Sequence, residues 1–245
     1  MFRAKAVLIG ALAAGALVHP AIAGQAPQME IVPAVSVTPD VSTLPRYTTD
    51  GGKTWTVLKE EKGIVERVPS GTSRAAFMAD HRMSPEEEGA IVQPVPPVPV
   101  VVDGTLYQPE EMHRFDGKQL GFTVGNDGQL YAFTDFAALE AFIAEDALTG
   151  PDALLSYDSM FYEDPNYTGS NQLAVPPGNS IPQLWGMDDI FSSMEINEFA
   201  ANDATIFEYS DYAGLYFVGR RGIPYPNLAN EGWNDRTSSL IVWPR

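Results

Sequence analysis

The chain of 245 residues contains no cysteine and few basic side chains. Without cysteine there is no disulfide, no thiolate nucleophile, no Cys-type zinc site and no iron–sulfur cluster. Only 15 Lys and Arg stand against 32 Asp and Glu, which gives a formal net charge of −17. This surplus of carboxylates repels phosphate backbones, so nucleic-acid binding through Lys and Arg is not expected. Cations, and metal ions first among them, are the favoured partners.

The sequence also lacks an apolar run long enough to cross a membrane. The longest run, residues 6–18, is shorter than the roughly 20 apolar residues that a span needs. It follows a short basic start and precedes the small residues Ala21 and Ala23, which is the pattern of a secretory signal peptide. We therefore expect residues 1–23 to be removed and the mature protein to be secreted or periplasmic.

Motifs of common enzyme classes are missing as well. There is no Gly-x-Ser-x-Gly elbow, no His-Glu-x-x-His, no phosphate-binding glycine loop and no EF-hand loop. The two histidines after residue 23, His81 and His113, are interpreted as ordinary surface or partly buried residues. Acidic runs such as 86–88 are interpreted as solvated faces. The sequence therefore predicts a protein that is not an enzyme.

Proline and glycine are frequent, with 20 and 21 residues, and they favour many turns and little long helix. Residues 24–90 are predicted to be an N-terminal extension with one β-hairpin at 46–59, turning at Asp50-Gly51-Gly52. The spacing in this hairpin is that of a single Asp-box, which is a turn staple, and an isolated hairpin is the preferred interpretation. Ser84-Pro85 is predicted to begin a helix.

The segment 91–103 is rich in Pro and Val and is predicted to be an extended linker of polyproline geometry. Residues 104–150 are predicted to form a small unit of a hairpin and a helix. The hairpin turns at Asn126-Asp127-Gly128, and Thr134 or Asp135 caps the helix. The apolar face of this helix is expected to consist of Phe136, Leu139, Phe142 and Ile143.

The last ninety or so residues contain one pattern twice. An aromatic–Glu–x–x–x–Tyr–x–Gly segment at 162–169 returns at 207–214, displaced by 45 residues. A run of two acidic or amide residues, two variable residues and two serines at 188–193 returns at 234–239, displaced by 46. Two ordered motifs at nearly constant spacing indicate a duplicated unit. Each unit is expected to contain a tight fold-back and about four short strands, and two units are expected to pair as a β-sandwich.

The serine-containing motif gathers hard oxygen donors on a short loop. Carboxylates and hydroxyls without His or Cys suit Ca²⁺, which accepts six to eight oxygen ligands in irregular geometry. The alternative is that the acidic pairs cap turns and the serines tie down loops. Because the motif occurs twice at the same distance behind a fold-back, calcium binding is the favoured interpretation.

Both motifs in both repeats resemble the microbial βγ-crystallins, over about residues 155–245. The resemblance implies a mainly β fold ending in a two-Greek-key sandwich, with two Ca²⁺ sites that each combine loops of both motifs. It also implies that Ser193 and Ser239 pin the folded hairpins, while the preceding hydroxyls and nearby backbone carbonyls bind the ions. The implied ligand residues are Glu163, Asp188, Asp189, Ile190, Ser192, Glu208, Asn234, Asp235, Arg236 and Ser238. Which member of each acidic pair binds directly stays open.

Arg236 departs from the simplest form of the motif. If its side chain points inward, it lowers cation affinity at the second site, so we expect the two sites to be unequal. The expected protein is a secreted, monomeric, non-enzymatic calcium binder stabilised by its ions. The alternative is a secreted interaction protein, such as a protease inhibitor or a cell-wall-directed toxin, with a protein or glycan partner. The long region before residue 155 favours this alternative, and the absence of cysteine speaks against it.

Overall fold

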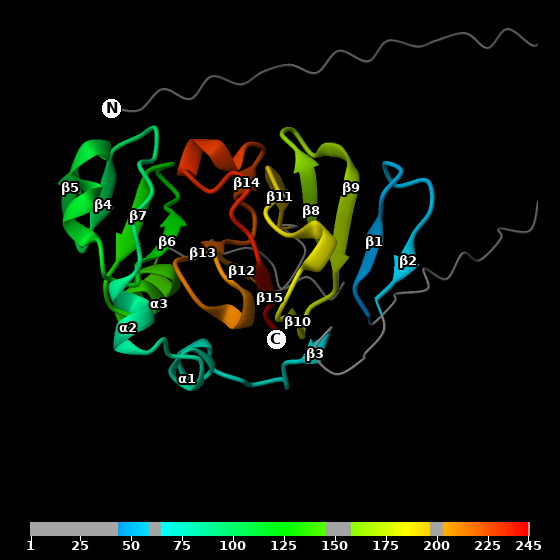
Figure 1. The fold of residues 1–245 in the computed structure, drawn as a ribbon, viewed down its shortest axis with the longest axis horizontal. Helices are drawn as coiled ribbons and strands as arrows, with labels where there is room; N and C mark the ends of the chain where they lie inside the picture. The colour runs from blue at the N-terminus through cyan, green and yellow to red at the C-terminus, as the bar shows by residue number, and fades with distance from the viewer. Residues whose placement is uncertain (1–43, 59–64, 146–157, 197–202, 245) are drawn as a thin grey trace, which may run out of the picture. The chain divides into compact units, whose positions relative to one another are not determined.

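The computed structural model describes residues 44–58, 65–145, 158–196 and 203–244. The predicted signal peptide lies outside these residues. All of the described residues belong to one compact unit, Val41–Arg245. Strands in two sheets dominate this unit, and the three α-helices in the described part are short (Figure 1). The prediction of a mainly β fold is confirmed.

The first sheet has the strand order β14 (Pro224–Tyr225), β11 (Ser193–Glu195), β8 (Ser159–Asp164), β9 (Thr168–Val175), β1 (Arg46–Thr48) and β2 (Thr56–Val57). The second has the order β3 (Glu66–Arg67), β10 (Asn179–Ile181), β15 (Ser239–Val242), β12 (Ala204–Phe207), β13 (Tyr216–Gly219), β6 (Gly121–Val124), β7 (Leu130–Phe133), β4 (Val100–Val102) and β5 (Thr105–Tyr107). The α-helices are α1 (Arg74–Asp80), α2 (Pro85–Gly89) and α3 (Phe136–Glu145). Short 3-10 turns are η1 (Pro109–Phe115), η2 (Trp185–Met187), η3 (Ser210–Tyr212) and η4 (Leu228–Glu231).

The duplicated unit folds as two four-stranded motifs, β8 to β11 and β12 to β15. In each motif the third strand leaves its own sheet: β10 pairs with β15 of the second motif, and β14 pairs with β11 of the first. The other three strands of each motif stay together, in the orders β11-β8-β9 and β15-β12-β13. The exchange interlocks two Greek keys into one sandwich, as the repeat predicted.

Residues before the sandwich extend both of its sheets. Strand β1 pairs with β9, and β6 runs parallel to β13 with Phe122 opposite Phe217. The predicted 46–59 hairpin is described to residue 58 and forms around Asp50, whose carboxylate accepts hydrogen bonds from the Thr48 and Thr54 hydroxyls at 2.7 and 2.6 Å. The prediction that this hairpin stands alone is wrong, because the open edge of β9 offers backbone groups that β1 satisfies.

The hairpin β6–β7 and helix α3 form as expected, and Asp135 caps the helix by accepting from the Ala138 N–H at 2.9 Å. Segment 91–103 differs from the expected linker. Its Gln93 is buried and donates its side-chain amide to the carbonyls of Phe115 and Lys118, and its last residues form β4 between β5 and β7. Proline-rich sequence keeps the backbone extended, but here the extended chain packs against its own unit.

Two apolar cores share the second sheet. Along β13, Phe217 packs into the core between the sheets, whereas Tyr216 and Val218 pack on the opposite face. That opposite face is covered by α1 and α3, which contribute Met78 and Leu139. The central strands β15, β12, β13 and β6 are therefore buried on both faces and are largely apolar, whereas the edge strands β3 and β5 are exposed.

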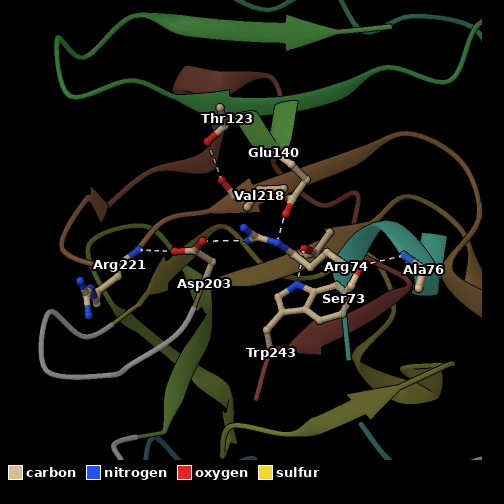
Figure 2. A network of polar contacts seen from close by, with 10 residues as sticks. Ser73, Arg74, Ala76, Thr123, Glu140, Asp203, Val218, Arg221 and Trp243 are labelled. Carbon is tan, nitrogen blue, oxygen red and sulfur yellow. Dashed lines mark hydrogen bonds and ion pairs between the residues drawn. The ribbon is translucent and has the colours of Figure 1, made fainter. Parts of the chain in front are cut away.

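An ion-paired arginine fastens α1 to the rest of the unit (Figure 2). The Arg74 guanidinium contacts Glu140 of α3 and Asp203, the residue before β12, at 2.8 Å each. The other carboxylate oxygen of Asp203 accepts from the Arg221 N–H at 3.0 Å. Arg74 thus joins two helices and the start of the second Greek key through one side chain.

Candidate metal centre

Two folded hairpins, joining β8 to β9 and β12 to β13, share one geometry. In each, two consecutive non-glycine residues have positive φ: Asn166 and Tyr167, and Asp211 and Tyr212. The aromatic pairs Tyr162–Tyr167 and Phe207–Tyr212 have ring centroids 5.7 Å apart in both hairpins. Gly169 has a φ of +105°, and a Cβ there would lie 2.9 Å from the backbone nitrogen of Asp164. Only glycine fits this fold-back without displacement.

The second serine of each pair closes a hairpin. Ser193 Oγ donates to the Asp164 carbonyl at 2.7 Å and accepts from the Tyr167 N–H at 3.0 Å. Ser239 Oγ repeats both bonds, with the Tyr209 carbonyl at 2.7 Å and the Tyr212 N–H at 3.1 Å. These bonds give the two serines the structural role that the resemblance implied.

The first serine of each pair meets the acidic loop of the opposite motif. Ser192 Oγ donates to Asp235 Oδ1 at 3.2 Å. Ser238 and Asp189 line one pocket, where hydrogen bonding from the Ser238 hydroxyl acts to lower the pKa of the Asp189 carboxyl. The loops are also joined through their backbones, since the Asp189 N–H donates to the Thr237 carbonyl at 3.1 Å. The second member of each acidic pair is therefore the one that faces the hydroxyl across the motif boundary.

An open pocket at the second hairpin brings together most of the predicted residues of one site. Its lining consists of Asp188, Asp189, Glu208, Tyr209, Ser210, Asp235, Arg236 and Ser238. Tyr209 and Ser210 were not predicted from the sequence, although they directly follow the predicted residue Glu208 in the hairpin. One acidic loop, the opposite hairpin and the opposite serine loop thus converge here.

The pocket is short of positive charge. Partial burial, and then the neighbouring Asp188 carboxylate, raise the pKa of Asp189, and Glu208 raises it further. The hydrogen bond from Ser238 and the charge of Arg236 oppose this rise without cancelling it. A bound cation would stabilise the ionised form of Asp189 and relieve the repulsion among the carboxylates.

Arg236 supplies part of the missing positive charge. Its guanidinium pairs with the Glu208 carboxylate and lies 5.8 Å from the centroid of the Trp233 ring. The corresponding position in the first loop is Ile190, which carries no charge. The second loop therefore carries a cation that the first loop lacks, and this cation, Arg236, lines the pocket.

Glu163 and Asn234 make their hydrogen bonds within their own segments. Both Glu163 and Glu208 hold their own hairpins. Glu208 accepts from the Leu215 N–H at 3.4 Å, and Glu163 accepts from the Asn171 and Ser170 N–H groups at 3.0 Å each, which lowers its pKa. Its carboxylate is thus committed, and the backbone of this segment is the part left to contact an ion. Asn234 donates its side-chain amide to Asp235 Oδ2 at 2.6 Å and so orients that carboxylate.

The donor types fit one class of metal. No group of three or more His, Cys, Asp or Glu side chains that could hold a metal occurs within the residues that the structure describes. An ion at the crossed loops would meet carboxylate, hydroxyl and carbonyl oxygens. Ca²⁺ accepts such a set, whereas zinc prefers nitrogen and sulfur.

Interlocked Greek keys, two folded hairpins and crossed acidic loops define a βγ-crystallin-type domain. Solved βγ-crystallins are similar to the chain over little more than a third of its length. A βγ-crystallin from Ciona intestinalis is 22% identical with a TM-score of 0.29, covering 35% of this chain and 98% of its own. One from an archaeon is 20% identical with a TM-score of 0.30, covering 36% and 99%. A variant domain from Clostridium beijerinckii is 23% identical with a TM-score of 0.30, covering 35% and 96%.

These TM-scores are below 0.5, so the class is defined by the strand order and the hairpins and not by the similarities. No family model matches the chain, and none of the curated proteins matches it. Across the described ranges, no helix has the length and apolar character needed to cross a membrane.

Proposed function

We propose that this chain is a secreted, non-enzymatic calcium-binding protein with two Ca²⁺ sites, one at each crossing of an acidic loop with the opposite serine loop. The observation that carries the proposal is the reciprocal placement of Ser192 against Asp235, through a hydrogen bond, and of Ser238 beside Asp189, in one pocket. A carboxylate and a hydroxyl from different motifs come together twice, in related positions, and all of these donors are oxygen atoms. This is the donor arrangement that Ca²⁺ tolerates.

The ligands divide between the two sites by these contacts. The first ion would be held by Asp235, Ser192, the carbonyl of Ile190 and the backbone beside Glu163. The second would be held by Asp189, Ser238, the carbonyl of Arg236 and the backbone beside Glu208. Asp188 and Asn234 stand beside the two ligating carboxylates, where Asp188 adds charge and Asn234 fixes orientation.

Calcium would act on stability, because each ion joins loops from both Greek keys. Extracellular modules bind calcium at about 10⁻⁴ to 10⁻³ M. An ion present at about 100 times its dissociation constant stabilises the folded state by roughly 2.7 kcal/mol. In a chain without disulfides, this is a large fraction of a typical net stability of about 5 to 15 kcal/mol.

Calcium titration calorimetry and thermal unfolding of residues 24–245 test the proposal. We expect two bound ions and a higher unfolding midpoint with calcium than with chelator. Ser192→Ala and Ser238→Ala should each remove or weaken one site, whereas Ser70→Ala, at an exposed position, should leave both intact. Absence of binding, or an unfolding midpoint that does not move with calcium, would reject the function.

Secretion is supported by the signal-peptide pattern of residues 1–23. Fractionation of cells that express the full chain should place the protein in the periplasm or the medium, with Gly24 or a neighbouring residue at its N-terminus. A chain lacking residues 1–23 should stay in the cytoplasm. Equal distribution of the two chains would contradict the secretory route.

A further inference from the structure

The second folded hairpin has two sets of neighbours. Its first half lines the candidate metal pocket through Glu208, Tyr209 and Ser210. Its second half, from Tyr212 to Gly214, contacts the segment 66–83, which contains β3 and α1. The same short loop therefore lies between the proposed ion and a helix that precedes this hairpin by more than a hundred residues.

Tyr212 makes the aromatic part of this contact. Its ring lies edge-on to Phe77 and to His81, with centroids 5.0 Å from each, and its hydroxyl donates to the Glu66 carboxylate at 3.3 Å. Tyr212 is almost fully buried. Its backbone N–H is bonded to Ser239, directly after the proposed ligand Ser238. The ring position of Tyr212 is thus set by the loop that would bind the ion.

Gly214 makes the polar part. Its N–H donates to the Met83 sulfur at 3.2 Å, just after α1, and its carbonyl accepts from the Gln119 side-chain amide at 2.8 Å. The first hairpin is placed differently, since its strand contacts the 46–59 hairpin through the Gly51 N–H and the Ser170 carbonyl at 3.0 Å. An ion at the first site would therefore touch a different part of the chain.

Helix α1 contacts residues on both sides of strand β12. Arg74 binds Asp203 at the start of β12 (Figure 2), and Phe77 binds Tyr212 in the hairpin that follows β12. Beneath the helix lie Phe207, Val218, Ile241 and Trp243, which form the outer apolar face of the second sheet. Opening of the 66–83 segment would expose this face.

We propose that calcium at the second site controls the docking of the 66–83 segment, so that loss of this ion exposes the outer apolar face of the second sheet. The inference rests on the proposed calcium function and adds a regulated segment to it. Ordering of the hairpin by the ion and ordering by α1 stabilise the same loop conformation, with positive φ at Asp211 and Tyr212. Whichever occurs first lowers the entropic cost of the other.

Hydrogen exchange of residues 24–245, with calcium or with chelator, tests this coupling. We expect the amides of 74–82 to exchange about tenfold more slowly with calcium, measured relative to the amides of β12 and β15 in the same sample. Ser238→Ala should abolish this difference, and Ser192→Ala should preserve it. Coupling is reciprocal, so Phe77→Leu should weaken calcium binding at one site about fivefold and leave the other unchanged.

The results that would contradict the coupling differ from those that would contradict calcium binding. Two bound ions by calorimetry without a relative change at 74–82 would overturn the coupling and leave the calcium function standing. Equal effects of Ser192→Ala and Ser238→Ala would also overturn it, because the ions would then act only on global stability. No calcium binding at all would overturn both proposals. Phe77→Leu separates these cases, since Phe77 is not among the proposed ligands.

Discussion

Replacement of Arg74 by alanine removes the cation that joins α1, α3 and β12. The side chains of Arg74, Glu140 and Asp203 are only 17, 28 and 19% exposed. Truncation therefore leaves two poorly solvated carboxylates close together without their counter-ion. Breaking a buried ion pair on one side costs about 3 to 5 kcal/mol, and partial exposure places this case near the lower end. For a unit of about 200 residues, this corresponds to a fall in unfolding midpoint of roughly 6 to 12 °C.

The assay is thermal unfolding of residues 24–245, followed by circular dichroism at pH 7.5 and pH 5. Burial is the first cause that raises the pKa of Glu140, and the charge of Arg74 opposes it. Without Arg74 the pKa of Glu140 rises further, so its ionised form costs stability at pH 7.5 and is protonated more readily as the pH falls. The deficit of Arg74→Ala should therefore be smaller at pH 5. Adding Glu140→Gln should recover part of the loss at pH 7.5.

Arg114→Ala is the matched control. Arg114 pairs with Glu111 at 3.1 Å, but these side chains are 59 and 35% exposed, and such surface pairs contribute about 0 to 1 kcal/mol. A midpoint shift for Arg74→Ala no larger than that for Arg114→Ala would refute the reasoning. A deficit that does not change between the two pH values would refute its electrostatic part.

Three further changes test other features. Burial raises the pKa of Glu231 from 4.5 to about 7, so the fold loses stability from this group as the pH rises through that window. Glu231→Gln should therefore stabilise the fold by roughly 3 kcal/mol at pH 8 and little at pH 4. Equal unfolding midpoints of the two proteins at pH 8 would count against this. Gly169→Ala and Gly128→Ala both place a Cβ at positive φ, but only the Cβ at residue 169 meets the backbone. Chemical denaturation should show that the free energy of unfolding falls by about 1 kcal/mol for Gly128→Ala and by clearly more for Gly169→Ala. Equal losses would contradict the clash. Arg236→Gln removes the internal cation, so calorimetry should show roughly tenfold tighter calcium binding at one site, and unchanged affinities would mean that Arg236 does not make the sites unequal.

Features that depend on nearby residues could be predicted from the sequence. The fold-back needs Gly169 and Gly214 at fixed distances from aromatic residues, and the structure shows both. The turn at Asn126-Asp127-Gly128 is equally local. For the glycines and for this turn, the residues that decide the conformation stand within a few positions of one another. The roles of Ser193 and Ser239 were implied instead by the resemblance to the βγ-crystallins, because their partners Asp164 and Tyr209 stand 29 and 30 residues away.

Features that depend on which strand edges meet could not be predicted. Alternation of apolar residues shows that β6 has a buried face, but it does not show that the strand pairs with β13, about 95 residues away. The Pro and Val content of 91–103 predicted an extended backbone correctly, yet extended chain suits a linker and a packed strand equally. Gln93 helps to hold this segment against the rest of the unit through hydrogen bonds to Phe115 and Lys118. Such bonds cannot be predicted from the spacing of residues in the sequence.

The same long-range contacts determine which part of the chain a measurement of calcium affinity must include. The repeat indicates a domain beginning near residue 155, and a fragment from there would contain every proposed ligand. That fragment would also lose β6 from the edge of β13, leave Asp203 without Arg74, and expose Tyr216, Val218 and Ile241. Its second hairpin would lack the contacts of Tyr212 with Phe77 and of Gly214 with Met83. Weak binding at the second site of such a fragment would report the missing helix and not the ligands, so affinities have to be measured on the whole unit.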